Sequence, residues 1–469
     1  MPQLRIMTWN IRNLGPTKLE HGDIMSAIAK VVVREQPDIF VALEINTRKE
    51  ATAEAIGAVL QAELQQAEAA RAQNNNAQQN NNNNNRQQNN NNNNNAQNAF
   101  PQGRAAWDTY AISPNTGVEF YGFFIRDARV VRPMPITANI TVLNADNASL
   151  VRNQAFVTFG GPGFCVMPLI RPNLVKQGQQ RSGRWTGARL PVFGLFNVAG
   201  AQDRYLPILA GHFAANQAQA ERQMNLLATF DVVNDICVAN STPARPTIDG
   251  QANQKLSQLI VTGDFNVDFD PADYPGRLAW KDPGGSRTEY DSDSDDDSDW
   301  EGSYESDNNN NNAAPTSSKK RRRFYYGGLL HDARSTLSLG LKAVITRKTH
   351  LMKPGKLQKR EVKSTEALAR KCYDNFFVNA AVTVVDAWVV DVPRQFKDPR
   401  DPLQLEDSVE YYADLGKKDL EWSDYDLPGN DVVGQLMTGS GEAVSTLAAL
   451  TGAALISDHL PVVMDFTLP

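Results

Sequence analysis

The stretch QLIVTGDFN, residues 258–266, decides the fold of this chain. Its apolar first half is typical of a strand that is buried on both faces. Polar residues follow at once, because Gly263 ends the run and Asp264 and Asn266 stand beyond it. Strand ends are where a rigid scaffold presents reactive groups to solvent. Asp264 and Asn266 are therefore candidate site residues.

The same arrangement recurs on both sides of this stretch. Polar residues border five further apolar runs: Asn10 after IMTW, Glu44 after IFVAL, His212 after LPILAG, Asp374 before NFFV, and Asp458 with His459 before LPVVMDF. A single residue of this kind is more often a cap or a turn residue. The number and the chemical type of these residues weigh against coincidence, so they predict one site assembled at strand ends.

Strand-like and helix-like segments are mixed along the remaining sequence. We expect strands at 4–9, 39–45, 118–126, 154–159, 206–210, 258–262, 375–378, 383–390 and 461–467, and helices at 22–35, 51–70 and 214–231. This mixture predicts an α/β (α+β) fold. A length of 469 residues suggests two or three domains. We nevertheless expect a single domain over residues 1–469, because two long tracts cannot add to a core.

Those two tracts are predicted to be disordered insertions. Residues 73–98 are almost entirely Asn, Gln and Ala, and residues 284–327 are acidic, then Asn-rich, then basic. Such compositions cannot bury enough apolar surface to offset chain entropy. Residues 289–307 carry ten Asp and Glu and neither Lys nor Arg, which accounts for the net charge of −6. Bulk charge therefore does not decide whether the folded part binds nucleic acid.

Several features bear on location and assembly. The N-terminus has no apolar segment of the kind found in signal peptides, and no run of 18 apolar residues is present. The three cysteines form no CxxC pair. We expect an intracellular protein without a membrane span, and a monomer. In a eukaryote the basic run 319–323 would suit nuclear import.

The candidate residues share a coherent chemistry. Carboxylates and an asparagine are oxygen ligands that suit Mg²⁺, Mn²⁺ or Ca²⁺. The two histidines suit proton transfer near neutral pH. Neither a GxSxG nucleophile motif nor a GxxxxGK[ST] phosphate loop is present. Hydrolysis of a phosphodiester needs a base, an acid and a cation, so the set predicts a phosphodiesterase that depends on a divalent cation, with Mg²⁺ favoured.

In this order, the segments TWNIRNLG, VALEI, GHF, GDFNVD, CYDNFFV and SDHLPV resemble the endonuclease/exonuclease/phosphatase superfamily. The resemblance covers the ordered chain from end to end. It implies a four-layer sandwich in which two mixed β-sheets pack face to face and helices cover the outer faces. It also implies an active site in a cleft at one end of the sheets.

Within that superfamily the chain is most similar to pancreatic-type deoxyribonuclease I. The resemblance implies that Glu44, helped by Asn10, Asp264 and Asp458, holds the cation. It further implies substrate contacts for a second group of residues: Arg12 toward DNA, and Arg152 and Asn266 toward the scissile phosphate.

The resemblance also implies catalytic roles. His212, oriented by Glu119, donates a proton to the leaving oxygen, and Asp374 helps to position the attacking water. His459 accepts a proton from that water and is oriented by Asp264 or Asp458. The two histidines could also exchange roles.

The sequence departs from the deoxyribonuclease pattern near Glu44. An arginine that reaches into the minor groove is replaced by Asn46. The family's secreted members carry disulfides, one of which brackets the stretch that here holds the long insertion before Asp374. Cys372 has no obvious partner in the sequence, which argues against a secreted protein.

A DNA endonuclease is the function that these residues favour. Residues 342–371 carry ten Lys and Arg against two Glu, and such a stretch can track a phosphate backbone or be a solvated hairpin. The alternatives are a phosphatase or phosphodiesterase acting on inositol phosphates, phospholipid headgroups or RNA. A catalytically inactive binding module is disfavoured because all the catalytic positions are intact.

Overall fold

The computed structural model describes most of the two ends of the chain and parts of its middle. The described residues are 3–47, 49–86, 107–113, 119–133, 137–143, 152–158, 164–166, 173–176, 179–182, 189–200, 205–215, 220, 223, 247–248, 251–252, 258–267, 341–357, 365–379, 381–407, 409–422, 429–438 and 444–468. The insertion predicted at 284–327 lies outside them.

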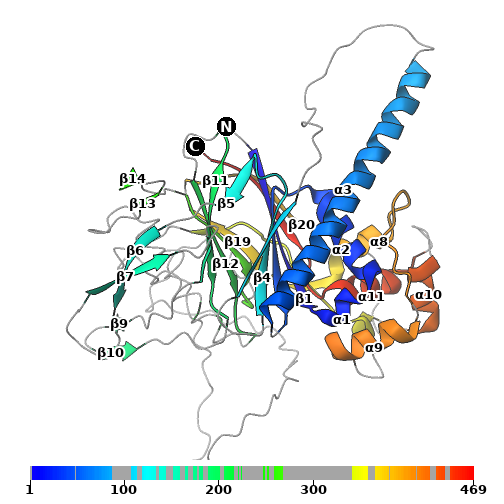
Figure 1. The fold of residues 1–469 in the computed structure, drawn as a ribbon. Coiled ribbons are helices and arrows are strands. Elements are labelled where there is room, and N and C mark those ends of the chain that lie inside the picture. The colour runs from blue at the N-terminus through cyan, green and yellow to red at the C-terminus, as the bar shows by residue number, and fades with distance from the viewer. Residues whose placement is uncertain are drawn as a thin grey trace, which may run out of the picture.

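Two mixed β-sheets pack against each other (Figure 1). The first sheet has six strands in the order β20 (Thr383–Val389), β21 (Val462–Thr467), β1 (Gln3–Leu14), β2 (Ile39–Asn46), β4 (Glu119–Ile125) and β3 (Asp108–Ile112). The second has seven, in the order β16 (Lys342–Ala343), β19 (Asp374–Val378), β15 (Ile260–Asp264), β12 (Tyr205–His212), β11 (Val192–Val198) and β5 (Val131–Pro133), with β8 (Phe164–Val166) also paired to β11.

Each sheet contains one parallel pair at its centre. β1 runs parallel to β2, and β12 runs parallel to β15, whereas the neighbouring pairs are antiparallel. The predicted fold of two mixed sheets with helices is therefore confirmed. The described residues also form three smaller sheets outside this pair. The first contains β14 (Gln251–Ala252), β13 (Thr247–Ile248), β6 (Thr137–Leu143) and β7 (Arg152–Thr158), the second β9 (Asn173–Lys176) and β10 (Gln179–Ser182), and the third β17 (His350–Leu351) and β18 (Ala369–Lys371).

Helices cover the outer face of the first sheet (Figure 1). The helical segments are α1 (Pro16–Leu19), α2 (Gly22–Glu35), α3 (Glu50–Arg86), α7 (Pro354–Leu357), the 3₁₀ helix η1 (Thr365–Leu368), α8 (Val392–Phe396), α9 (Val409–Asp419), α10 (Asn430–Thr438) and α11 (Thr446–Ile456). The helix predicted at 214–231 lies mostly outside the described residues. No helix in the described ranges has both the length and the apolar character needed to cross a membrane.

The helix α3 is longer than the sequence predicts. The Asn-rich insertion is expected to begin at residue 73, whereas α3 continues to Arg86 and projects beyond the body of the molecule (Figure 1). Its first half is anchored by Ala53, Ile56 and Leu60, which are fully buried. Once such a helix is nucleated, propagation adds one hydrogen bond for each residue that is fixed, which favours its continuation beyond residue 73. Residues 87–98 lie outside the described part.

The alternation of side chains along β1 separates two cores. Leu4 and Ile6 pack between the sheets, whereas Met7, Trp9 and Ile11 pack against the helices. Adjacent strand residues point to opposite faces, so Thr8 and Asn10 continue the row that faces the second sheet. Oγ1 of Thr8 lies 2.6 Å from Oγ1 of Thr262 on β15. The inter-sheet core therefore becomes polar toward the end of β1, which is where the candidate residues lie.

Candidate active site

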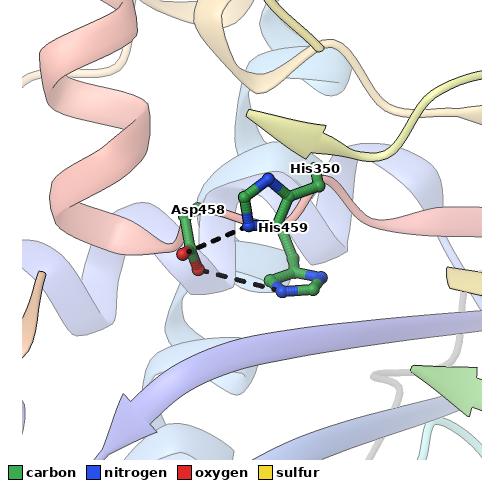
Figure 2. A group of neighbouring side chains, drawn as sticks. All are labelled: His350, Asp458 and His459. Atoms are coloured by element: carbon green, nitrogen blue, oxygen red, sulfur yellow. Dashed lines mark ion pairs between the residues drawn. The ribbon is translucent and has the colours of Figure 1, made fainter. Parts of the chain in front are cut away.

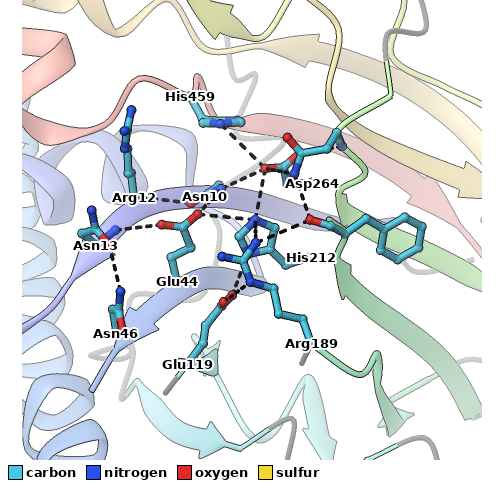
Figure 3. Close-up of polar contacts among 12 residues, drawn as sticks. Asn10, Arg12, Asn13, Glu44, Asn46, Glu119, Arg189, His212, Asp264 and His459 are labelled. Atoms are coloured by element: carbon cyan, nitrogen blue, oxygen red, sulfur yellow. Dashed lines mark hydrogen bonds and ion pairs between the residues drawn. The ribbon is translucent and has the colours of Figure 1, made fainter. Parts of the chain in front are cut away.

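Asn10 connects the two sheets at the polar end of the core (Figure 3). Its Nδ2 donates to Oε1 of Glu44 at 3.1 Å and to Oδ2 of Asp264 at 2.9 Å. Its Oδ1 accepts a hydrogen bond from the backbone N–H of Arg12 at 3.0 Å. These three bonds fix the amide, because both carboxylates require a donor. The asparagine thereby holds two acidic side chains, one from each sheet, close to one point.

A bulge in β2 turns Glu44 toward that point. In a regular strand Leu43 and Ile45 would face the same side. Here Leu43 packs in the inter-sheet core and Ile45 packs against the helices, so the alternation is broken at Glu44. Glu44 has a left-handed backbone with φ of 62°, and the pairing of β2 with β4 shifts register there. An extra residue of this kind re-aims a side chain beside a site. Oε2 of Glu44 accepts from the backbone N–H of Asn13 at 2.9 Å.

Gly263 allows β15 to approach β12 closely. It is paired with Gly211, and the next residues along, His212 and Asp264, are paired with each other. A Cβ on Gly263 would lie 1.8 Å from the carbonyl oxygen of Gly211, and its φ is +142°. Only glycine meets both conditions without strain. This glycine pair therefore sets His212 beside Asp264.

His212 is held from both ends of its ring (Figure 3). Its Nδ1 lies 2.6 Å from Oε1 of Glu119, and its Nε2 lies 2.7 Å from Nη1 of Arg189. Nε of Arg189 also pairs with Oε2 of Glu119 at 2.5 Å. Burial favours the neutral ring, but the charge of Glu119 outweighs it and raises the pKa of His212. The ring is thus oriented by a buried carboxylate, as a proton-transfer histidine requires.

His459 is oriented in the same way from the other side. Its Nδ1 lies 2.8 Å from Oδ2 of Asp374, and its Nε2 lies 3.7 Å from Oδ2 of Asp264. Burial opposes the charged ring, but these two carboxylates outweigh it and raise the pKa of His459 well above its ordinary value. The sequence suggests Asp264 or Asp458 as the orienting group. The structure gives that contact to Asp374, because the pairing of β15 with β19 sets Asp374 opposite Asp264.

Asp458 lies beside this pair and has a different neighbour. Arg12 forms an ion pair with Oδ2 of Asp458, and burial of the carboxyl is outweighed by that guanidinium, so the pKa of Asp458 lies well below its ordinary value. Nε2 of His350, on β17, lies 3.6 Å from the same oxygen (Figure 2). Oδ1 of Asp458 lies 4.0 Å from Nε2 of His459. Asp458 is therefore placed between two histidines.

The loop that carries Asp458 and His459 is fastened to β1. Oγ of Ser457 donates to the carbonyl of Asn10 at 2.6 Å and accepts from the backbone N–H of His459 at 3.0 Å. The ammonium of Lys18 is fully buried and donates to three carbonyls, those of Ile11 at 3.3 Å, Ile456 at 2.7 Å and Arg12. A cation at the end of α11 also suits the helix dipole. These contacts fix the two ends of the chain relative to each other.

Acidic and histidine side chains gather closely enough to hold a divalent cation. In the described part of the chain, three groups have ligand atoms within 4.8 Å of one another: His350–Asp458–His459, Asp264–Asp374–His459 and His21–Asp23–Asp407. Among the described residues, Oδ1 of Asp374 and Oδ1 of Asp458 are buried without a hydrogen-bond partner. Glu44 belongs to none of the three groups. The oxygen-rich donor set nevertheless fits a hard cation.

Most of the residues singled out in the sequence therefore meet in one network. Asn266 joins it through its backbone N–H, which donates to Oδ1 of Asp264 at 2.9 Å, and through Nδ2, which donates to the carbonyl of Phe213 at 3.0 Å. Nδ2 of Asn46 donates to Oδ1 of Asn13 at 2.9 Å. Arg152 begins β7, but its side chain lies outside the described part of the structure. Its substrate contact stays a prediction.

Three residues of the site were not predicted. Arg189 precedes the apolar run LPVFGLF, so the strand-end pattern that identified Asn10 and Asp264 could have identified it as well. His350 lies within the basic stretch 342–371, which is distinguished by its charge and not by its histidine. Lys18 follows Pro16 in a short helix, and nothing in the sequence distinguishes it from a surface lysine.

Comparisons with known proteins give structural neighbours only. The endonuclease/exonuclease/phosphatase from Bacteroides vulgatus is 11% identical, with 100% of each chain covered and a TM-score of 0.41. A mannosyl-6-phosphatase from Bacteroides thetaiotaomicron is 11% identical over 99% of this chain and 100% of its own, with a TM-score of 0.40. D. rerio TDP2 complexed with single-strand DNA product is 10% identical over 100% of both chains, with a TM-score of 0.37. No family model and no curated protein matches the chain.

Proposed function

We propose that this chain is a divalent-cation-dependent phosphodiesterase and that its substrate is DNA. One observation carries the proposal. Nε2 of His212 and Nε2 of His459 lie 3.5 Å and 3.7 Å from the same oxygen, Oδ2 of Asp264. Two proton-transfer groups thus face one point from opposite sides, and each is held at Nδ1 by a buried carboxylate. Cleavage of a phosphodiester needs one proton accepted from water and one donated to the leaving oxygen.

The roles of the chain's own residues follow from this arrangement. His459, held by Asp374, accepts the proton from the attacking water, and His212, held by Glu119, donates one to the leaving oxygen. The alternative assignment exchanges these two roles. Arg189 is 35% exposed, so its guanidinium can move from His212 onto a non-bridging phosphoryl oxygen. The side-chain amide of Asn266 stands beside it as a further neutral donor.

Glu44, Asn10, Asp264 and Asp458 are the residues that would hold the cation. Their oxygens suit Mg²⁺, with Mn²⁺ and Ca²⁺ as alternatives. The bound cation would stabilise the negative charge that develops on the phosphoryl oxygens. Asn10 donates to both Glu44 and Asp264 through its amide, so these two oxygen ligands already lie close together before a cation binds.

The preference for a nucleic acid rests on the β17–β18 hairpin. Four exposed cations lie on β18 or flank β17: Arg347 and Lys348 before β17, Lys353 after it, and Lys371 at the end of β18. The hairpin is joined to the catalytic loop, because the backbone N–H of Leu351 donates to the carbonyl of Asp458 at 2.7 Å. A row of exposed cations next to the reacting groups suits a polyanion longer than one phosphate.

The test uses supercoiled plasmid with Mg²⁺, Mn²⁺ or Ca²⁺ and then with EDTA. We expect nicking by the wild type with a metal and none with EDTA. His212→Ala and His459→Ala should each lower the rate by about 10²–10⁴-fold, and the double variant should be inactive. His21→Ala, which changes a histidine paired with Asp407 on the helix layer, is the matched control.

Absence of nicking with every metal would sink DNA as the substrate. If the chain hydrolysed bis(p-nitrophenyl) phosphate under the same conditions, the broader proposal of a phosphodiesterase would still stand. RNA, inositol phosphates and sphingomyelin would then be tested in turn.

A further inference from the structure

His350 contributes a third imidazole to the edge of the site (Figure 2). It lies on β17, where it forms an isolated backbone bridge with His459, and the backbone N–H of Leu460 donates to the carbonyl of Thr349 at 2.7 Å. The two imidazole rings lie 5.0 Å apart at 86°. No step of the proposed hydrolysis uses His350. Its placement therefore calls for another explanation.

The carboxylate between the two rings has one oxygen without a partner. Arg12 engages Oδ2 of Asp458, whereas Oδ1 is buried and accepts no hydrogen bond from any described residue. A buried carboxylate oxygen normally has a partner, and its absence needs an explanation such as an ion. This oxygen is the one that faces Nε2 of His459, at 4.0 Å.

The second histidine cluster of the molecule offers a contrast. In His21–Asp23–Asp407, both oxygens of Asp23 are already used. Oδ1 accepts from the backbone N–H of Ile24 at 2.7 Å, and Oδ2 accepts from the backbone N–H of Glu406 at 3.0 Å and from the hydroxyl of Tyr412. That cluster is explained by protein contacts. The cluster around Asp458 is not.

The remaining geometry suits a transition metal. Nδ1 of His459 is fixed by Asp374 at 2.8 Å, the carboxylate–histidine contact that orients metal-binding imidazoles. Ligand atoms of a tetrahedral zinc ion are about 3.4 Å apart. Nε2 of His350 lies 3.6 Å from Oδ2 of Asp458, the oxygen that Arg12 engages. The His350 side chain is 30% exposed, so a rotation of its ring can bring Nε2 toward Oδ1 and close the site. Two imidazoles select zinc-class ions over Mg²⁺.

We propose that His350, Asp458 and His459 bind a zinc-class transition-metal ion, and that this ion suppresses hydrolysis. The suppression rests on the proposed function, because the ion would occupy the Nε2 lone pair with which His459 accepts a proton. The site itself does not depend on that function. An ion bound there excludes His459 from proton transfer, and it also takes Asp458, one of the residues that would hold the catalytic cation, while leaving Glu44 and His212 in place.

The first experiment measures binding alone. The full chain, at one fixed Mg²⁺ concentration that is the same for every variant, is titrated with Co²⁺, whose visible absorption reports nitrogen ligation, and in parallel with Zn²⁺ by calorimetry. We expect one ion per chain in the wild type. His350→Ala and His350→Gln should weaken binding by at least about tenfold, since even outer-shell changes cost that much. His21→Ala should bind as the wild type does.

The second experiment measures plasmid nicking in Mg²⁺ with increasing Zn²⁺. Zn²⁺ should inhibit the wild type, and His350→Ala should keep the basal rate while requiring at least about tenfold more Zn²⁺ for the same inhibition. Co²⁺ binding that is unchanged in His350→Ala, or no ion bound by the wild type, would overturn the site. Binding without inhibition would overturn only the suppression. A chain that hydrolyses nothing would still be tested by the Co²⁺ titration.

Discussion

Nη1 of Arg189 lies 2.7 Å from Nε2 of His212. A guanidinium can only donate, so this contact requires a bare lone pair on Nε2 and the imidazole proton on Nδ1, where Glu119 accepts it. Protonation of Nε2, which a proton donor needs, would place two cations against each other. In the proposed reaction, Arg189 must therefore leave His212 before His212 donates its proton, and a bound phosphate is the group that would receive the guanidinium.

Replacement of Arg189 by methionine should therefore slow the reaction strongly. We expect kcat/KM to fall by about 10²–10³-fold, the usual cost of losing one donor to a developing oxyanion. Arg189→Lys should recover only part of the loss, because an ammonium cannot span Glu119 and His212 as a planar guanidinium does. Arg129→Met is the control, since Arg129 pairs with Asp127, two residues away on an exposed turn. An unchanged kcat/KM in Arg189→Met would exclude a role for Arg189 in the reaction.

The exposed cations of the β17–β18 hairpin should matter for DNA and not for a small substrate. Combined replacement of Arg347, Lys348 and Lys353 by glutamine should raise KM for plasmid and leave hydrolysis of bis(p-nitrophenyl) phosphate unchanged. The slope of log affinity against log salt concentration should become shallower by about 0.9 for each lost phosphate contact. Replacement of Lys417 and Lys418, two cations exposed on α9, by glutamine serves as a control for charge removed elsewhere on the surface. Equal effects on both substrates would contradict a backbone-tracking hairpin.

Two glycine replacements should have opposite outcomes. Gly263→Ala forces a Cβ against the carbonyl of Gly211 at a φ of +142°, so we expect a loss of more than about 3 kcal/mol of unfolding free energy, with loss of activity. Gly22→Ala, at the first residue of α2, meets nothing within 4 Å. It should be neutral or stabilise by about 0.4–1 kcal/mol. Urea unfolding measures both, and similar values for the two variants would show that the close approach of β12 and β15 is not required.

Lys18→Met should loosen the attachment of the loop that carries Asp458 and His459. The buried carbonyls of Ile11 and Ile456 and the partly buried carbonyl of Arg12 would lose a charged donor, and each buried acceptor left without a partner costs about 1–3 kcal/mol. We expect a large loss of thermal stability and, below the unfolding temperature, a lower kcat, because Arg12 and Asp458 would no longer be fixed. Lys30→Met, on α2, should change neither quantity. A variant that is less stable but has a normal kcat would reduce Lys18 to a purely structural residue.

The strands that carry the site were predictable, because their apolar runs are continuous and their polar ends are abrupt. The helix at Gly22–Glu35 coincides with its prediction, and the strand predicted at 258–262 lies two residues further on, at Ile260–Asp264. The direction of the Glu44 side chain was not predictable from the alternation of buried and exposed residues, since it depends on a left-handed backbone at that residue. The partner of His459 depends on strand register between β15 and β19. Register is a property of the assembled sheet, and no local pattern contains it.

The attachment of Ser457 to the carbonyl of Asn10 has a consequence for the order of events in the cell. The opening strand β1 lies between β2 and β21, so it leaves the ribosome long before one of its two neighbours has been made. Until residues 457–467 emerge, that edge of β1 stays unpaired, and Asp458 and His459 are missing. The network around Asn10 can therefore be completed only after residues 457–467 have been synthesised, so no shorter N-terminal fragment contains the whole set of site residues.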